Sequence, residues 1–112
     1  MAIRISKPWI PLTADAVGVL PGQLGVYQLA DRDGSVVFIG FAGGLSLFGL
    51  RSELERALAA PPSGAARFRY EVNQQYLSRH RELLMLHLAD HGTLPIGNCA
   101  DPPPRLGRLS PL

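Results

Sequence analysis

Cysteine and lysine are scarce in this chain of 112 residues. The single cysteine, Cys99, excludes an internal disulfide and leaves no second thiol at a metal-ligand spacing. The 11 basic residues are one lysine and ten arginines, and nine acidic residues reduce the net charge to +2. Such a weak charge does not indicate a protein that coats nucleic acid, because binding many phosphates requires many clustered cations.

Long apolar runs are also missing. No run approaches the roughly 20 residues that a transmembrane helix needs, and the first ten residues lack the apolar stretch and cleavage site of a signal peptide. We therefore expect a soluble, cytoplasmic protein without membrane contact. The chain length and its 46% hydrophobic content predict one domain built around one core.

Proline and glycine divide the chain into three parts. Residues 1–23 contain three prolines, so we expect an extended lead-in with one helical turn near 13–17, where Thr13 can act as a cap. Residues 24–98 carry the regular patterns of a folded domain. Residues 99–112 include three consecutive prolines, which favour polyproline geometry and predict an extended tail.

The strand patterns predict a small three-stranded antiparallel sheet. Residues 24–30 and 35–40 are rich in strand-forming residues and are joined by a four-residue loop that ends in glycine, which indicates a β-hairpin. Apolar and charged residues alternate over 67–72, which predicts a third strand with one polar face exposed to solvent.

Two leucine patterns predict helices that flank this sheet, so the fold class is α/β in the mixed (α+β) sense. Spacings of three and four predict a helix near 47–60, which two prolines end, with an apolar face made of Leu47, Leu50, Leu54 and Leu58. A longer helix is predicted near 75–91, with Gly92 as its left-handed cap and a stripe made of Leu77, Leu84 and Leu88.

Four short motifs follow one another in an order that resembles the GIY-YIG superfamily. The first two strands carry Gly25-Val26-Tyr27 and Phe38-Ile39-Gly40, which are separated by ten residues. The next helix carries Arg51, the last helix carries Glu82, and Pro95-Ile96-Gly97-Asn98 follows as a Pro-x-x-Asn turn. The resemblance covers the whole central domain and implies a GIY-YIG-like fold.

The chemistry that this resemblance implies is metal-assisted cleavage of a phosphodiester. Tyr27 would help to activate water, Arg51 would stabilise the charge that develops on the phosphate, and Glu82 would hold a magnesium ion. The resemblance also implies a structural frame for that site, made of Gly25, Phe38, Gly40 and Asn98.

Two departures from the family pattern indicate that this chemistry is incomplete. Phe38 stands where the family usually has a tyrosine, so one hydroxyl is missing. Glu82 lies thirteen residues before Pro95, whereas nuclease members place their glutamate nearer, at a spacing that here falls on Leu86 or His87. Either Glu82 serves from an earlier helical turn or the metal ligand has been lost.

Charged and aromatic residues outside these motifs leave further alternatives open. Glu55 stands where the family often has a histidine, and we expect it to form an ion pair with Arg51 at a spacing of four residues. Trp9 is either a plug over the edge of the core or a binding residue. Three histidines share one face of the last helix with Tyr76 and suit either a metal or an interface, namely His80, His87 and His91.

Two functions follow from these observations. In the first, the chain is an accessory subunit that has kept the fold, has lost cleavage and needs no cofactor. It would bind a larger protein partner through its two ends, chiefly through Trp9, Leu106 and Leu109. In the second, the chain is a magnesium-dependent endonuclease that acts on DNA through Tyr27, Arg51 and Glu82.

Overall fold

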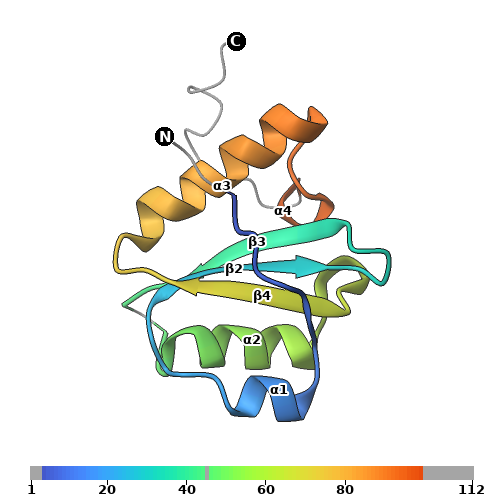
Figure 1. Ribbon diagram of the computed structural model, residues 1–112. Coiled ribbons are helices and arrows are strands. Elements are labelled where there is room, and N and C mark those ends of the chain that lie inside the picture. Colours follow the sequence, from blue (N-terminus) through green and yellow to red (C-terminus); the bar gives the residue numbers. More distant parts are fainter. Residues whose placement is uncertain (1–3, 45, 100–112) are drawn as a thin grey trace.

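The computed structural model describes residues 4–44 and 46–99 (Figure 1). The predicted contact residues Leu106 and Leu109 therefore lie outside the described residues. In chain order the elements are β1 (Ile10–Pro11), α1 (Ala14–Gly18), β2 (Gly25–Ala30), β3 (Val36–Ala42), α2 (Gly49–Ala59), a 3-10 turn (Pro62–Gly64), β4 (Arg67–Val72), α3 (Tyr76–His91) and α4 (Ile96–Cys99).

The sheet has four strands in the order β1-β4-β2-β3, and every neighbouring pair is antiparallel. The prediction of three strands was wrong by one, because Ile10 and Pro11 of the expected lead-in pair with Phe68 and Arg67. A strand of two residues is too short to show alternation, and proline is tolerated only at a sheet edge. The fold class itself, a small antiparallel sheet with flanking helices, is confirmed.

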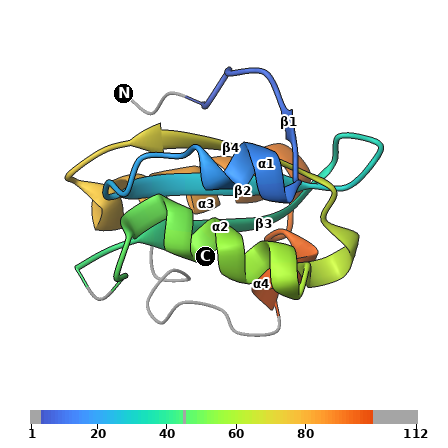
Figure 2. The ribbon, with the colours of Figure 1, turned by 90° about the horizontal axis from the view of Figure 1, so that it is seen from below.

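Helices cover both faces of the sheet (Figures 1 and 2). Helices α1 and α2 lie on one face and α3 crosses the other. Because neighbouring residues of a strand point to opposite faces, β2 contributes to two cores. The α2-side core includes Val17, Tyr27, Leu29, Leu50, Leu54 and Phe68. The α3-side core consists of Ile5, Val26, Ile39, Leu83 and Leu84.

The predicted leucine stripes are confirmed only in part. Leu50 and Leu54 are buried, but Leu47 is 82% exposed because α2 begins at Gly49, after it. On α3, Leu84 is buried while Leu77 is 61% exposed. The face of α3 that packs on the sheet is centred near Tyr76, His80 and Leu83, so Leu84 joins the core while Leu77 lies outside it.

Local capping signals are confirmed at two helix ends. The Thr13 hydroxyl oxygen accepts a hydrogen bond from the Ala16 amide at 3.2 Å and starts α1. Gly92 has a φ of 78° and ends α3 in the left-handed conformation that glycine adopts without strain. In the described part of the chain, no helix is long and apolar enough to cross a membrane.

Candidate functional site

The two tripeptide motifs lie side by side on β2 and on the edge strand β3. Tyr27 of β2 is the sheet partner of Gly40 on β3 and of Tyr70 on β4. A Cβ atom at Gly40 would lie 2.4 Å from Cζ of Tyr27 and 2.7 Å from Cε2 of Phe38. Only a residue without a side chain leaves room there, so the Tyr27 ring lies across the backbone of β3.

Asn98 joins α4 to the middle of the second tripeptide. The Ile39 amide donates to Oδ1 of Asn98 at 2.9 Å, and Nδ2 of Asn98 donates to the Ile39 carbonyl oxygen at 3.0 Å. His80 of α3 donates from Nε2 to the same carbonyl oxygen, also at 3.0 Å. These bonds satisfy both backbone polar groups of Ile39 with side chains from outside the strand. Asn98 itself is buried.

Tyr27 is enclosed by the α2-side core. The residue is only 5% exposed, and the structure records no hydrogen bond from its hydroxyl to any described residue. Burial raises the pKa of Tyr27 well above its usual range; the nearby Glu53 carboxylate adds to this rise and Arg56 opposes it. The phenol is therefore protonated at neutral pH and cannot act as a base.

Replacing Tyr27 with phenylalanine should reduce the loss of stability that the natural chain shows at alkaline pH. The pKa of Tyr27 is raised in the folded state, above an unfolded value of about 10. The contribution of the Tyr27 phenol to the free energy of unfolding is therefore complete below the unfolded pKa. It is lost as the pH rises above that pKa, because the unfolded chain ionises first. Urea denaturation at about pH 8 and about pH 11 should show a smaller loss for Tyr27→Phe than for the natural chain. An equal loss in both proteins would contradict the raised pKa of Tyr27.

Arg51 contacts the ring of Phe48, the residue before α2. Its guanidinium carbon lies 5.0 Å from the centroid of the Phe48 ring. The expected ion pair with Glu55 is not formed, because Arg51 has no carboxylate partner among the described residues. On a helical wheel, Arg51 and Glu53 lie on opposite flanks of the buried stripe that contains Leu54.

The charged residues of α2 that act on the pKa of Tyr27 are Glu53 and Arg56, which the sequence interpretation missed. Oε2 of Glu53 accepts a hydrogen bond from the Ser46 hydroxyl at 2.6 Å and lies 3.8 Å from Nη2 of Arg56. The signal that could have found Glu53 is its position beside the buried stripe of α2, which favours a side chain that reaches toward the sheet.

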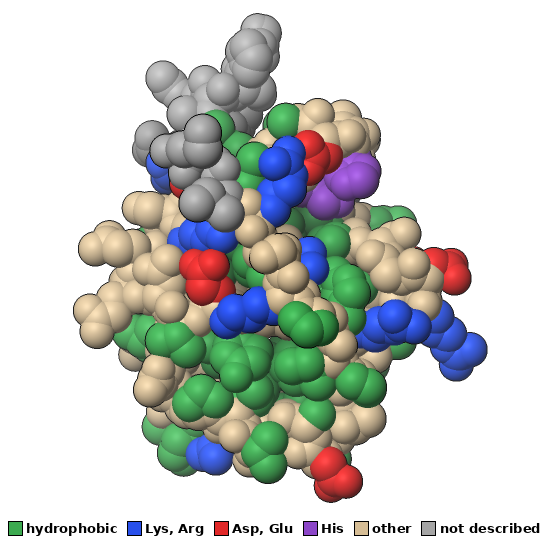
Figure 3. Space-filling model, in the orientation of Figure 1, with side chains coloured by type: hydrophobic (Ala, Val, Ile, Leu, Met, Phe, Trp, Pro, Cys, Tyr) green, Lys and Arg blue, Asp and Glu red, His purple; other side chains and the backbone are tan. Residues whose placement is uncertain are grey.

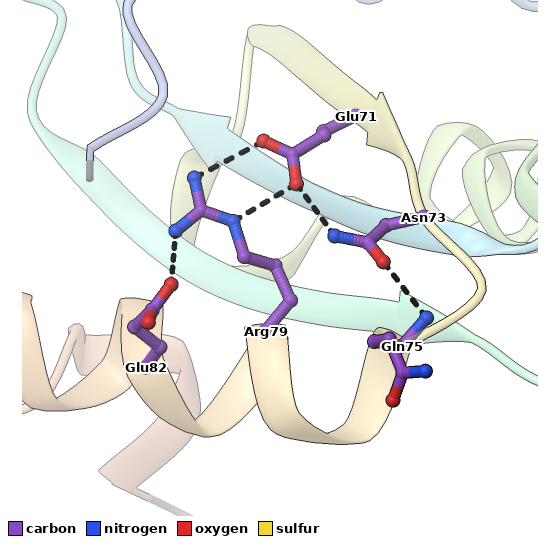
Figure 4. Close-up of polar contacts among 5 residues, drawn as sticks. All are labelled: Glu71, Asn73, Gln75, Arg79 and Glu82. Atoms are coloured by element: carbon purple, nitrogen blue, oxygen red, sulfur yellow. Dashed lines mark hydrogen bonds and ion pairs between the residues drawn. The ribbon is translucent and has the colours of Figure 1, made fainter. Parts of the chain in front are cut away.

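Glu82 belongs to a network centred on Arg79 (Figure 4). Arg79 donates to both carboxylate oxygens of Glu71, at 2.9 and 3.0 Å, and its third contact is a hydrogen bond to Glu82. Asn73 donates to Glu71 at 3.0 Å. The Arg79 side chain is only 10% exposed, so this network fills the space between β4 and α3.

This network also corrects the prediction that one face of β4 is exposed to solvent. Arg69 and Glu71 lie on the predicted polar face, but both are partly buried. Partial burial alone would raise the pKa of Glu71, yet hydrogen bonds from Arg79 and Asn73 lower it overall. Glu71 is paired with Arg79 of α3, a contact between distant elements that the alternating pattern of a single strand cannot reveal.

Trp9 lies against the same polar face, in the segment before β1. The Arg69 guanidinium carbon is 4.1 Å from the centroid of the indole ring. Arg69 also donates to Oε1 of Gln28 at 2.7 Å and to the Lys7 carbonyl oxygen at 3.1 Å. Trp9 therefore covers Arg69 at the edge of the sheet.

The three predicted catalytic residues do not come together. Glu71 is the sheet partner of Val26, whose side chain belongs to the α3-side core. Glu82 is tied to Glu71 through Arg79 and lies on that face of the sheet, whereas Tyr27 points to the opposite face, which α2 covers.

The residues present do not fit the magnesium site that the resemblance implies. The Glu82 carboxylate is engaged by Arg79. Within residues 4–44 and 46–99, no three histidine, cysteine, aspartate or glutamate residues are grouped so that they could hold a metal ion. No reaction step through a magnesium ion follows from this arrangement.

Comparison with known proteins identifies a family but no activity. No curated protein and no solved structure matches the chain. One family model matches residues 3–90, which includes the whole sheet, α1, α2 and most of α3. The chain therefore belongs to the family described as Domain of unknown function (DUF7508).

Proposed function

We propose that this chain is a GIY-YIG-like accessory subunit that binds a larger protein and does not cleave nucleic acid. One observation supports the proposed loss of cleavage. The only carboxylate that the resemblance offers as a metal ligand, Glu82, is held by Arg79 on the sheet face opposite Tyr27.

Cleavage of a phosphodiester by this route requires a held metal ion beside the reacting water. The ion offsets the charge on the leaving oxygen, and the catalytic groups must surround one phosphate. Tyr27 and Glu82 cannot contact a common phosphate from opposite faces of the sheet. The Tyr27 phenol, with its raised pKa, also cannot accept a proton at neutral pH.

The relationship to the GIY-YIG fold is supported by the arrangement of the motifs. The tripeptides of β2 and β3 pair so that Tyr27 lies opposite Gly40. Asn98 of the Pro-x-x-Asn turn binds Ile39 in the middle of the second tripeptide. The order of β2, β3, α2, β4 and α3 is the one that the resemblance implies.

The surface supports a protein partner more than a nucleic acid. Figure 3 shows apolar side chains gathered on the half of this face that lies over α1 and α2. Val19, at the C-terminal end of α1, is 83% exposed, and Leu47 and Phe48 before α2 are also exposed. Apolar surface of this kind is typical of protein interfaces, whereas phosphate binding requires clustered cations.

With magnesium or manganese, the purified chain is expected not to cleave single-stranded, duplex or branched DNA above the level of a Tyr27→Phe variant. The reason is the separation of Tyr27 from Glu82. Gel assays on labelled substrates check this, with Glu82→Gln as the second variant. Glu55→Gln is the matched control, because Glu55 is an exposed glutamate on α2.

The endonuclease alternative makes the opposite prediction in the same assay. Metal-dependent nicking that is lost in both Tyr27→Phe and Glu82→Gln, but kept in Glu55→Gln, would show that the chain is a nuclease.

A tagged form of the chain, purified from its native cells, is expected to retain one protein partner in fixed proportion. Val19→Asp should reduce that yield, because it places a charge in the exposed apolar surface without disturbing the core. Leu77→Asp is the matched control, since Leu77 is exposed on α3, in the opposite layer. Deleting residues 101–112 tests the predicted contact of the tail. Retention of the partner at full yield by both Val19→Asp and the truncated chain would contradict the proposed contacts.

A further inference from the structure

Two histidines stack at the C-terminal end of α3. His87 and His91 are separated by four residues, which places them on successive turns of one helix face. Their ring centroids are 4.4 Å apart and the ring planes are inclined by 35°. Figure 3 shows histidine side chains on the surface at this end of the molecule. Two imidazoles this close can share one bound ion.

The backbone that follows α3 fixes the orientation of the first ring. Gly92 turns the chain in the left-handed conformation, and the next residue presents its carbonyl oxygen to the helix. Nδ1 of His87 lies 2.9 Å from the Thr93 carbonyl oxygen. A carbonyl oxygen can only accept, so Nδ1 carries the hydrogen and Nε2 keeps its lone pair. Histidines that bind metal ions in proteins are commonly oriented by a hydrogen bond of this kind.

The third histidine of the helix has a different role. His80 donates from Nε2 to the Ile39 carbonyl oxygen and contacts the Phe41 ring, with centroids 5.0 Å apart. It is therefore engaged by β3, one helical turn or more from the stacked pair. Only His87 and His91 combine close rings with a surface position.

We propose that His87 and His91 form a binding site for one divalent late transition-metal ion such as Zn²⁺, with water as the remaining ligands. Neutral imidazole is a ligand that zinc, copper and nickel share, whereas magnesium and calcium prefer oxygen. The hydrogen bond from Nδ1 of His87 to the Thr93 carbonyl oxygen leaves Nε2 as the nitrogen that would bind the ion.

The charged residues beside the two histidines do not provide a third protein ligand. Asp90 lies between the two histidines in the sequence, but Arg4 binds both of its carboxylate oxygens, at 2.6 and 2.9 Å. This ion pair neutralises Asp90 and keeps its carboxylate away from a metal ion. A bound ion would link two turns of α3, and through the His87 hydrogen bond it would hold the Thr93 loop against the helix.

Isothermal titration of the full chain with ZnCl₂ near neutral pH tests this proposal. One zinc ion should bind to each chain, and His87→Gln and His91→Gln should each weaken binding by at least about tenfold. Zinc should also raise the melting temperature of the natural chain but not that of His91→Gln. Because His91 is exposed, that variant should fold normally, which circular dichroism checks.

Two control variants separate this site from other zinc ligands. His80→Gln keeps an N–H donor for the Ile39 carbonyl oxygen and should leave zinc affinity unchanged. Cys99→Ser tests the single thiol of the chain. The proposal is overturned if the natural chain shows no saturable zinc binding, if both His87→Gln and His91→Gln bind zinc as well as the natural chain, or if Cys99→Ser alone removes binding.

Discussion

Replacing Asn98 with alanine is expected to lower the free energy of unfolding by about 2–3 kcal/mol, because it leaves a buried amide without a partner. The Ile39 amide would lose its only acceptor in the described structure, while His80 would still donate to the Ile39 carbonyl oxygen. Urea denaturation followed by circular dichroism measures the change. A loss below about 0.5 kcal/mol, the scale of an ordinary surface substitution, would contradict the role of Asn98.

Asn98→Asp is the matched variant. It keeps an oxygen for the Ile39 amide but turns the donor to the Ile39 carbonyl oxygen into a second acceptor. A charged carboxylate would then face a carbonyl oxygen at a buried position, so this variant should be less stable than Asn98→Ala at neutral pH. Acid should relieve the difference, because a protonated carboxyl group can donate again.

The position of Asn98 also protects the edge of the sheet from pairing with another chain. Strand β3 is an edge strand, and the unpaired amides and carbonyls of an edge can pair with another chain. The Asn98 side chain occupies the polar groups of Ile39, and Gly97 comes so close to the Val37 carbonyl that a Cβ atom would lie 2.6 Å from its oxygen. Helix α4 therefore blocks part of this edge, which favours contacts through other surfaces.

Much of the fold follows from local sequence patterns. The hairpin of β2 and β3 and the body of α3 lie where alternation, leucine spacing and Gly92 predict them, within two residues at most boundaries. These patterns depend on neighbours along the chain. Strand β1 was missed because its pairing with Phe68 and Arg67 is made across more than fifty residues and involves only Ile10 and Pro11.

The candidate site was less predictable, because it depends on how each helix is rotated about its axis. The motif order gives Tyr27, Arg51 and Glu82 their elements correctly, but packing decides which way each side chain points. On α2 the buried leucines turn Glu53 toward Tyr27 and Arg51 toward Phe48. Helix α3 packs on the face opposite α2, so Glu82 lies on that face, where Arg79 pairs with both Glu71 and Glu82.

Gly40→Ala is expected to lower the free energy of unfolding by about 2–3 kcal/mol, the usual range for overpacking a core. The backbone of Gly40 is not left-handed, so the cost arises from the methyl group alone. That group would meet the Tyr27 ring at 2.4 Å and the Phe38 ring at 2.7 Å. Gly44→Ala is the control, because a Cβ atom there meets nothing within 4 Å, and it should change stability by less than about 0.5 kcal/mol.

A double-mutant cycle with Tyr27→Ala identifies the ring as the cause. Alone, Tyr27→Ala should cost about 3–5 kcal/mol, because it leaves a cavity in the α2-side core. The added methyl group of Gly40→Ala would then occupy space that the ring has left. The double variant should therefore lose less stability than the sum of the single losses, by about 1–2 kcal/mol. Strict additivity, measured by urea denaturation, would show that Gly40 is required for another reason than the position of Tyr27 across β3.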